Sequence, residues 1–207
     1  MDSGVIVAGG RSTRFGDTDK AVAELAGTPM IRRVADRIEA VVDELVVNCR
    51  PEQTDAIRDA MDGYPLPVTY AEDEVPDRGP VAGIHNGLES AAGRYAFVVA
   101  CDMPFVDPAL AAYLFERAAG HDAAVPRLES GWFQTTQAVY HAEAMTGACE
   151  RVLEAAENPQ ILAPLEELDY VVVEEADLET VTDLETFENV NTKAEFDAAQ
   201  ERLSSTE

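Results

Sequence analysis

The chain has 207 residues, with 40 acidic residues against 15 basic ones, a formal net charge of −25 and a hydrophobic fraction of 46%. A charge this negative excludes nucleic acid and anionic membranes as general partners, because both require clustered positive charge. The composition is that of a globular protein, and the length suits one domain, so we expect a single domain over residues 1–207.

Cellular location is predicted from the apolar runs, the N-terminus and the cysteines. The run at residues 95–101 is far too short to span a bilayer, and no basic region precedes the first apolar stretch as in a secretion signal. Cys49, Cys101 and Cys149 are widely separated and form no CxxC pattern, which argues against a disulfide framework or a zinc site. We therefore expect a cytoplasmic protein with reduced thiols.

Lysine is nearly absent: the sequence has Lys20 and Lys193 against thirteen arginines. Acidic residues spread along the whole chain, together with scarce lysine, indicate a high-salt cytoplasm, where screening weakens the repulsion between like charges. In a chain with so few lysines, Lys20 at the end of a glycine-rich segment indicates a specific role more than an ordinary solvated surface residue.

In the first half of the chain, short β-branched runs alternate with amphipathic stretches, which predicts strands and helices in turn. The expected strands are residues 4–8, 45–48, 68–71 and 96–101, and the expected helices are residues 51–61, 81–92 and 108–118, the last capped by Asp107. A further helix is expected to start with Thr28 as N-cap and Pro29 at its first position. Its buried face would hold Ile31, Val34, Ala35, Ile38 and Val42.

From about residue 123 the pattern is looser. Residues 123–126 and 135–140 are expected to be strands that join the sheet in antiparallel fashion, and residues 170–174 another strand. Residues 192–195 form a capping box that opens a final helix. The whole order predicts a three-layer, Rossmann-like α/β fold with a mostly parallel central sheet and helices on both faces.

In such sheets, ligands bind beyond the carboxyl ends of the strands. A glycine segment, Asn48, Asp73 and Asp102 each follow an expected strand, so they are candidates to meet in one crevice.

The glycine segment is VAGGRSTRFGDTDK, residues 7–20. It is neither a Walker A motif nor GxGxxG. Glycines such as Gly9 and Gly10 allow backbone amides to approach a phosphate, while Arg14 and Lys20 would neutralise its charge. The alternative is a surface turn with incidental cations, but the preceding strand and Lys20 favour phosphate binding.

Asp102 lies in VVACDMPFVDP, directly after an apolar strand. A carboxylate there is well placed to hold Mg²⁺, which prefers one or two carboxylates together with phosphate oxygens. From the residues alone, a turn-capping role for Asp102 is an equal alternative.

Two further segments carry less specific signals. DRGPVAGIHNG, residues 77–87, indicates either a loop in close contact with a ligand or an ordinary Gly-Pro turn. ENVNT, residues 188–192, would be a short strand with Asn189 and Asn191 on the same side, offering amides to a polar ring or a phosphate. Helix capping by Asn191 or Thr192 is the simpler explanation for part of that segment.

Taken in order, VAGGRSTRFGDTDK, RGPVAG, CDMPF and NVNT resemble the molybdenum cofactor guanylyltransferases, the MobA family, from about residue 4 to residue 196. The charge pattern adds a halophilic archaeon as the expected source. The resemblance implies an enzyme that transfers GMP from Mg²⁺-bound GTP to the terminal phosphate of molybdopterin and releases pyrophosphate. GTP, molybdopterin and other proteins of molybdenum cofactor biosynthesis are the implied partners.

The resemblance also implies roles for individual residues. Lys20, Arg14 and Asp102 are the implied catalytic residues, with Asp102 as the Mg²⁺ ligand. The implied nucleotide-binding residues are Val7, Ala8, Gly9, Gly10, Lys20, Asn48, Asp73 and Asp102. The implied pterin-binding residues are Gly79, Pro80, Gly83, Asn189 and Asn191. The segment 127–140 departs from the family pattern, because Thr135 and Thr136 stand where members often carry a glutamine-proline element.

Four alternatives stay open. Three are related transferases, because base choice depends on a few loop contacts: a molybdopterin cytidylyltransferase, an adenosylcobinamide-phosphate guanylyltransferase and a sugar-phosphate nucleotidyltransferase. The fourth is a nucleotide-binding regulator without catalysis, although such a protein need not keep both Lys20 and Asp102.

Overall fold

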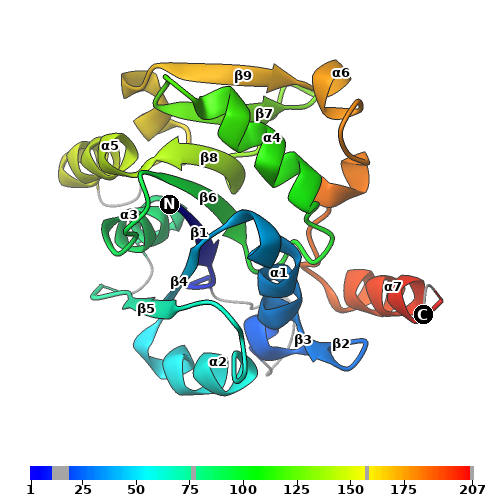
Figure 1. Cartoon of the computed structure of the whole chain (residues 1–207). Helices are drawn as coiled ribbons and strands as arrows, with labels where there is room; N and C mark the ends of the chain where they lie inside the picture. Colours follow the sequence, from blue (N-terminus) through cyan, green and yellow to red (C-terminus); the bar gives the residue numbers. More distant parts are fainter. Residues whose placement is uncertain (11–18, 76–77, 157–158, 206–207) are drawn as a thin grey trace.

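The computed structural model describes residues 1–10, 19–75, 78–156 and 159–205. At its centre is a seven-stranded sheet of order β5-β4-β1-β6-β8-β7-β9, with helices around it (Figure 1). The strands are β1 (Asp2–Val7), β4 (Glu44–Cys49), β5 (Val68–Glu72), β6 (Tyr95–Ala100), β7 (Ala123–Arg127), β8 (Gln137–His141) and β9 (Tyr170–Glu174).

The register of the central strands sets the position of the site. Val7, the last residue of β1, pairs with Asn48 of β4 and with Ala100 of β6, and all these pairings are parallel. β4 and β5 are also parallel, so Asp73 follows β5 at the same edge. The carboxyl ends of four neighbouring strands therefore meet, as expected from the sequence.

Helices cover both faces of the sheet, which confirms the predicted three-layer α/β class. One face packs against α1 (Met30–Ile38), α2 (Thr54–Ala60), α4 (Pro108–Ala118) and α6 (Glu175–Leu178). The other packs against α3 (Pro80–Glu89) and α5 (Ala142–Ala155). Four 3-10 helices have the bounds Lys20–Val22, Glu39–Val41, Pro51–Gln53 and Leu184–Phe187, and a fifth spans Ala163–Glu167.

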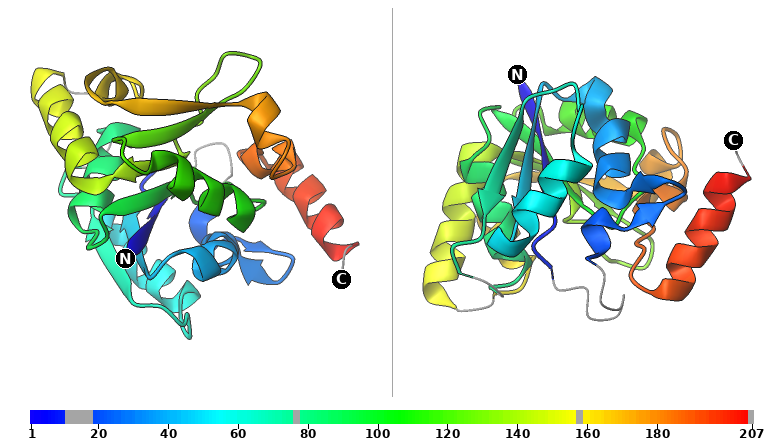
Figure 2. Two further views of the ribbon diagram at one scale, coloured as in Figure 1. Left: turned by 45° about the horizontal axis from the view of Figure 1, so that its top comes forward. Right: turned by 90° about the horizontal axis from the view of Figure 1, so that it is seen from below.

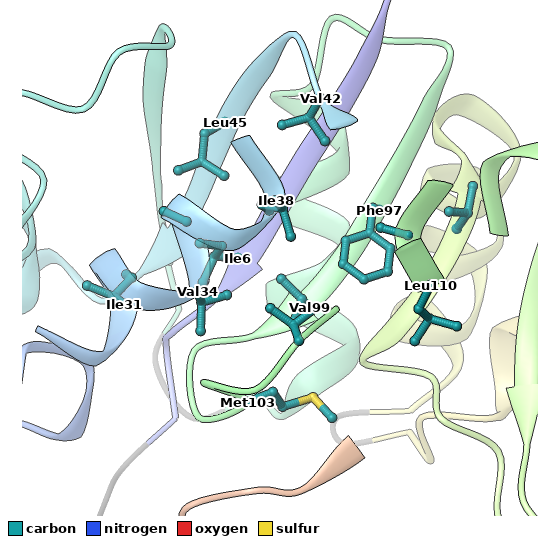
Figure 3. Packing of buried hydrophobic residues seen from close by; sticks show 14 of the residues in the cluster. Ile6, Ile31, Val34, Ile38, Val42, Leu45, Phe97, Val99, Met103 and Leu110 are labelled. Carbon is teal, nitrogen blue, oxygen red and sulfur yellow. The ribbon is translucent and has the colours of Figure 1, made fainter. Parts of the chain in front are cut away.

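The larger buried cluster joins the sheet to α1 and α4 (Figure 3). Ile6 and Val99 of neighbouring strands lie under Val34 of α1, while Phe97 meets Leu110 of α4. Full burial of one such side chain contributes roughly 1.5–3 kcal/mol. This packing holds β1 and β6, which lead into the glycine segment and Asp102, in fixed relative positions.

The predicted start of the first helix is wrong by one residue. Thr28 and Pro29 form β3, which pairs antiparallel with β2 (Glu24–Leu25). Ala26 and Gly27 have φ values of 50° and 74°, so the chain turns sharply there and keeps Thr28 extended. Helix α1 therefore starts at Met30, with Pro29 at the N-cap and no side-chain cap. Val42 lies beyond the helix, yet it is buried in the expected cluster.

The later part of the chain corrects further expectations. Strand β8 is antiparallel to β6 and β7 as predicted, but β7 is parallel to β9 and runs in the direction of β6. Helix α5 was not predicted. The expected strand around Asn189 is wrong, because residues 188–191 have no regular secondary structure. The backbone amide of Val190 instead donates a hydrogen bond to the Asp102 carbonyl at 2.8 Å.

The final helix is confirmed as α7 (Lys193–Ser204), with the Thr192–Glu195 capping box present. It lies beside β2 and β3, on the side of the molecule away from α5 (Figure 2). Phe196 and Ala199 of α7 pack against Leu25 and Met30 in a small separate cluster. This docking brings Asn191, two residues before α7, to the carboxyl edge of the sheet. Within the described residues, no helix is both long and apolar enough to cross a bilayer.

Asp107 caps α4 as predicted, and its substitution should measurably lower stability. One carboxylate oxygen accepts from the Ala109 amide at 2.8 Å and the other from the Thr182 hydroxyl at 2.8 Å. We expect Asp107→Ala to lower the free energy of unfolding by about 1–2 kcal/mol, measured by urea denaturation. Asp107→Asn keeps an oxygen for the cap and should lose much less. Equal losses in the two variants would contradict the capping role.

Candidate functional site

A cavity of about 560 Å³ lies at the carboxyl ends of β1, β4 and β6. Its lining unites almost all the residues singled out in the sequence: Val7, Ala8, Gly9, Gly10, Lys20, Asn48, Asp73, Gly79, Pro80, Gly83, Asp102 and Asn191. Ala100, Cys101, Arg78 and Thr136 also line it. Segments far apart in the sequence thus form one concave surface.

Lys20 lies at the centre of a buried polar contact. Its side chain is 8% exposed, and Nζ donates to Asp102 Oδ2 and to Asn191 Oδ1, both at 2.7 Å. These partners come from the turn after β6 and from the segment before α7. The contact therefore ties the glycine segment, the strand carboxylate and the C-terminal part of the chain together.

Asp102 keeps one carboxylate oxygen available. Oδ2 accepts from Lys20, whereas Oδ1 is buried and accepts no hydrogen bond from the described residues. A buried, unpaired carboxylate oxygen is costly and favours a ligand such as a cation. No cluster of three or more histidine, cysteine, aspartate or glutamate side chains suited to a metal occurs in the described ranges. A cation here would take its other ligands from bound oxygens.

Asn48 and Asp73 form a second polar group on the β4–β5 side. Asn48 Nδ2 donates to Asp73 Oδ1 at 2.7 Å and to the Ala71 carbonyl at 3.2 Å, and Asn86 Nδ2 donates to the same Asp73 oxygen at 2.9 Å. Asn48 is fully buried, and its Oδ1 has no donor within the described part of the chain. This arrangement fixes the carboxylate orientation and leaves an acceptor for a ligand.

Three glycines satisfy local geometric demands. A Cβ on Gly9 would lie 2.4 Å from Asp73 Oδ2, and one on Gly83 would lie 2.5 Å from Asn48 Oδ1. Gly79 has φ 80°, in the left-handed region that side chains disfavour, and it precedes Pro80 at the start of α3. Because glycine has no Cβ, the backbone at Gly9 and Gly83 lies closer to the Asp73 and Asn48 side chains than it could with another residue at these two positions.

The close approach at Gly9 predicts a specific loss. Gly9→Ala should push Asp73 away and weaken nucleotide binding about tenfold or more, since it disturbs the geometry of the site. Gly10→Ala is the matched control for stability, because a Cβ there meets no atom of the described residues within 4 Å. Thermal unfolding and titration calorimetry of both variants provide the measurement. If Gly9→Ala left stability and nucleotide binding unchanged, displacement of the Asp73 side chain would have no effect on the site, and the prediction would be contradicted.

Two predicted site residues are not among the described residues that line the cavity. Arg14 lies outside the described residues. Asn189 is exposed and lines a separate hollow with Phe105 and Arg202, so the expectation that it faces the same side as Asn191 is wrong. Val190 is buried between the two asparagines, and the irregular backbone does not give them a common direction.

Four residues beyond those predicted from the sequence lie at or behind the cavity. Arg78 and Thr136 line it, and Arg50 and Gln53 contact its glycine backbone from outside. A cation two residues after Asn48, in a chain poor in basic residues, was the available signal for Arg50. No such signal marked Gln53, because its burial depends on tertiary packing.

The three thiols are poor candidates for a nucleophile. Burial raises the pKa of Cys49, and raises that of Cys149 to about 12. Burial and the neighbouring Asp102 carboxylate raise the pKa of Cys101, which lines the cavity. A thiol is nucleophilic as the thiolate, so Cys101 is unreactive near neutral pH.

Comparison with known proteins agrees with this geometry. Residues 4–169 match the family described as "MobA-like NTP transferase domain". A protein of Natronomonas pharaonis named "Probable molybdenum cofactor guanylyltransferase" is 53% identical over 98% of both chains. One of the same name from Haloferax mediterranei is 35% identical over 97% of this chain and 93% of its own length. Both sources are halophilic archaea, as the charge pattern predicted.

Among solved structures, the molybdopterin-guanine dinucleotide biosynthesis protein A from Archaeoglobus fulgidus superimposes with a TM-score of 0.79 at 27% identity, covering 98% of this chain and 99% of its own. The family match, the relatives and the shared fold extend over the strands and loops that build the cavity. The chain therefore belongs to the MobA-like NTP transferase family, among the molybdenum cofactor guanylyltransferases.

Proposed function

We propose that the chain, working as a single nucleotidyltransferase domain, transfers GMP from GTP to the terminal phosphate of molybdopterin. The observation that carries this function is the cavity in which Lys20 contacts both Asp102 and Asn191, beside the glycine backbone. The relatives named molybdenum cofactor guanylyltransferase support the nucleotide and the acceptor.

In this reaction a phosphate oxygen of the acceptor attacks the α-phosphorus of GTP, the bond to the bridging oxygen of the β-phosphate breaks, and pyrophosphate leaves. The acceptor phosphate is largely ionised near neutral pH, so no strong general base is required. Catalysis then depends on positioning and charge neutralisation. The backbone of Gly9 and Gly10 lies where it can cradle phosphates, and the Lys20 ammonium offsets their negative charge.

The residues fit a magnesium ion. Asp102 presents a buried oxygen that has no hydrogen-bond partner among the described residues, and Mg²⁺ accepts one carboxylate together with phosphate oxygens and water. When bound, such an ion would neutralise charge on the phosphates and withdraw electrons from the reacting phosphorus. Asp102 would hold it, while Lys20, which shares that carboxylate, would remain close to the phosphates.

The remaining binding roles follow from position in the cavity. Asn48 and Asp73 are proposed to contact the nucleotide, together with Val7 and Ala8. Gly79, Pro80, Gly83 and Asn191 are proposed to lie near the pterin. Arg14 is proposed to bind phosphate because of the family resemblance of its segment. Other proteins of molybdenum cofactor biosynthesis, inside the cytoplasm, would supply the acceptor.

The decisive assay combines the protein with GTP, CTP or ATP, Mg²⁺ and either molybdopterin or adenosylcobinamide phosphate in high salt, and measures pyrophosphate release. GTP-dependent release with formation of the guanine dinucleotide is expected. Release with CTP alone would assign the cytidylyltransferase activity instead, and release only with adenosylcobinamide phosphate would change the acceptor. No release with any nucleotide would leave a nucleotide-binding regulator.

A further inference from the structure

Two polar side chains that do not line the cavity donate hydrogen bonds to the backbone carbonyls of residues 8–10. Arg50 follows β4 directly, and Gln53 is the last residue of the 3-10 turn Pro51–Gln53. Neither belongs to the lining of the cavity, as the described residues outline it. They can therefore influence a ligand there only through the residues they contact.

Arg50 contacts the chain on both sides of the segment between Gly10 and Asp19. Its Nη1 donates to the Gly9 carbonyl and to the Gly10 carbonyl, each at 2.8 Å. Nη2 lies 3.6 Å from Asp19 Oδ2, and the side chain is 12% exposed. One guanidinium thus contacts three acceptors from two places in the chain.

Gln53 repeats this arrangement from a buried position. It is 3% exposed, and its Nε2 donates to the Ala8 carbonyl at 3.2 Å and to Asp19 Oδ2 at 2.6 Å. Its Oε1 accepts from the Arg50 amide at 2.9 Å, which links the two side chains. Asp19 in turn accepts from the Ala21 amide at 3.0 Å, next to Lys20.

These contacts determine which way the peptide groups point. In a trans peptide the carbonyl and the following N–H point in opposite directions. Since the carbonyls of Ala8 and Gly9 face Gln53 and Arg50, the amides of Gly9 and Gly10 point away from them. The carbonyl dipoles are thereby removed from the ligand side, where they would repel an anion.

We propose that Arg50 and Gln53 are positioning residues that orient the amides of Gly9 and Gly10, and the backbone next to Lys20, for the polyphosphate of the nucleotide. This inference rests on the proposed function, because it assumes a nucleoside triphosphate in the cavity. It adds two residues that act through the backbone and not by contact with the substrate.

The test compares binding of GTP and GMP to the full chain by titration calorimetry with Mg²⁺ in high salt. Arg50→Lys keeps the charge but loses the planar fork that reaches several acceptors, and Gln53→Met keeps the volume but loses the hydrogen bonds. Each should weaken GTP binding about tenfold and GMP binding much less, because charge-assisted, oriented contacts to the polyphosphate are lost. Arg58→Lys on α2, where the guanidinium lies over the Tyr70 ring, is the matched control and should leave both affinities unchanged.

The outcomes separate the two proposals. If the wild-type chain binds no GTP, the proposed function fails and the inference fails with it. If the wild-type chain binds GTP, and both variants keep its preference for GTP over GMP, the function stands and the positioning role is overturned. Loss of the urea-unfolding transition in both variants would assign the contacts to folding alone and would also overturn it.

Discussion

Asp102→Asn should lower the rate of GMP transfer by about 10³-fold or more, because it removes the charge that opposes Lys20 and would hold a metal. The asparagine has nearly the same shape, so the cavity should keep its form. However, its neutral oxygen is a much weaker ligand for Mg²⁺ than the buried carboxylate oxygen that has no partner among the described residues. Pyrophosphate release at saturating GTP and acceptor measures the effect.

The matched control for this change is Asp107→Asn, five residues along the chain. Asp107 caps α4 and lies outside the lining of the cavity. The same chemical change there should leave the rate of transfer near that of the unsubstituted chain. If Asp102→Asn retained more than about a tenth of the rate, a decisive catalytic role for its charge would be contradicted.

Lys20→Ala should lower kcat/KM for GTP by about 10²–10³-fold, since a positioned cation near the phosphates is lost. It should also lower the free energy of unfolding by about 1–3 kcal/mol, because the oxygens of Asp102 and Asn191 lose their shared donor. Steady-state kinetics and urea denaturation give the two numbers. The two losses together would distinguish a buried, functional lysine from a surface one.

The chain offers a close control, because Lys193 is its other lysine. Lys193 is exposed on α7 and pairs with Asp197 four residues later at 2.6 Å. Such a surface pair contributes about 0–1 kcal/mol, so Lys193→Ala should change stability little and turnover not at all. Comparable losses in the two variants would mean that Lys20 has no special role.

Several features could be read from local sequence because their causes are local. The strand from Asp2 to Val7, the cap at Asp107 and the capping box at Thr192 depend on side-chain periodicity and on hydrogen bonds within a few residues. The convergence of Asn48, Asp73 and Asp102 also follows from sequence. It requires only that parallel strands end at one edge of a sheet.

The errors occurred where strand pairing and burial, which side-chain periodicity does not encode, decide the structure. The hairpin of β2 and β3 draws Thr28 out of the predicted helix, and pairing with β9 gives β7 its direction. Asn189 was expected beside Asn191, but burial of Val190 and its contact with the Asp102 carbonyl turn this segment differently. Periodicity alone carries no information about such partners.

The sequence by itself thus determined a mostly parallel α/β sheet with a glycine segment, a lysine and a strand-terminal carboxylate, because each depends on residues close together in the chain. Only the tertiary structure decided that Lys20 reaches Asn191, 171 positions away, and that Arg50 and Gln53 hold the carbonyls of the glycine segment. The reason is physical: a buried donor is satisfied by whichever acceptors the packed elements bring within about 3 Å, and packing depends on the whole chain.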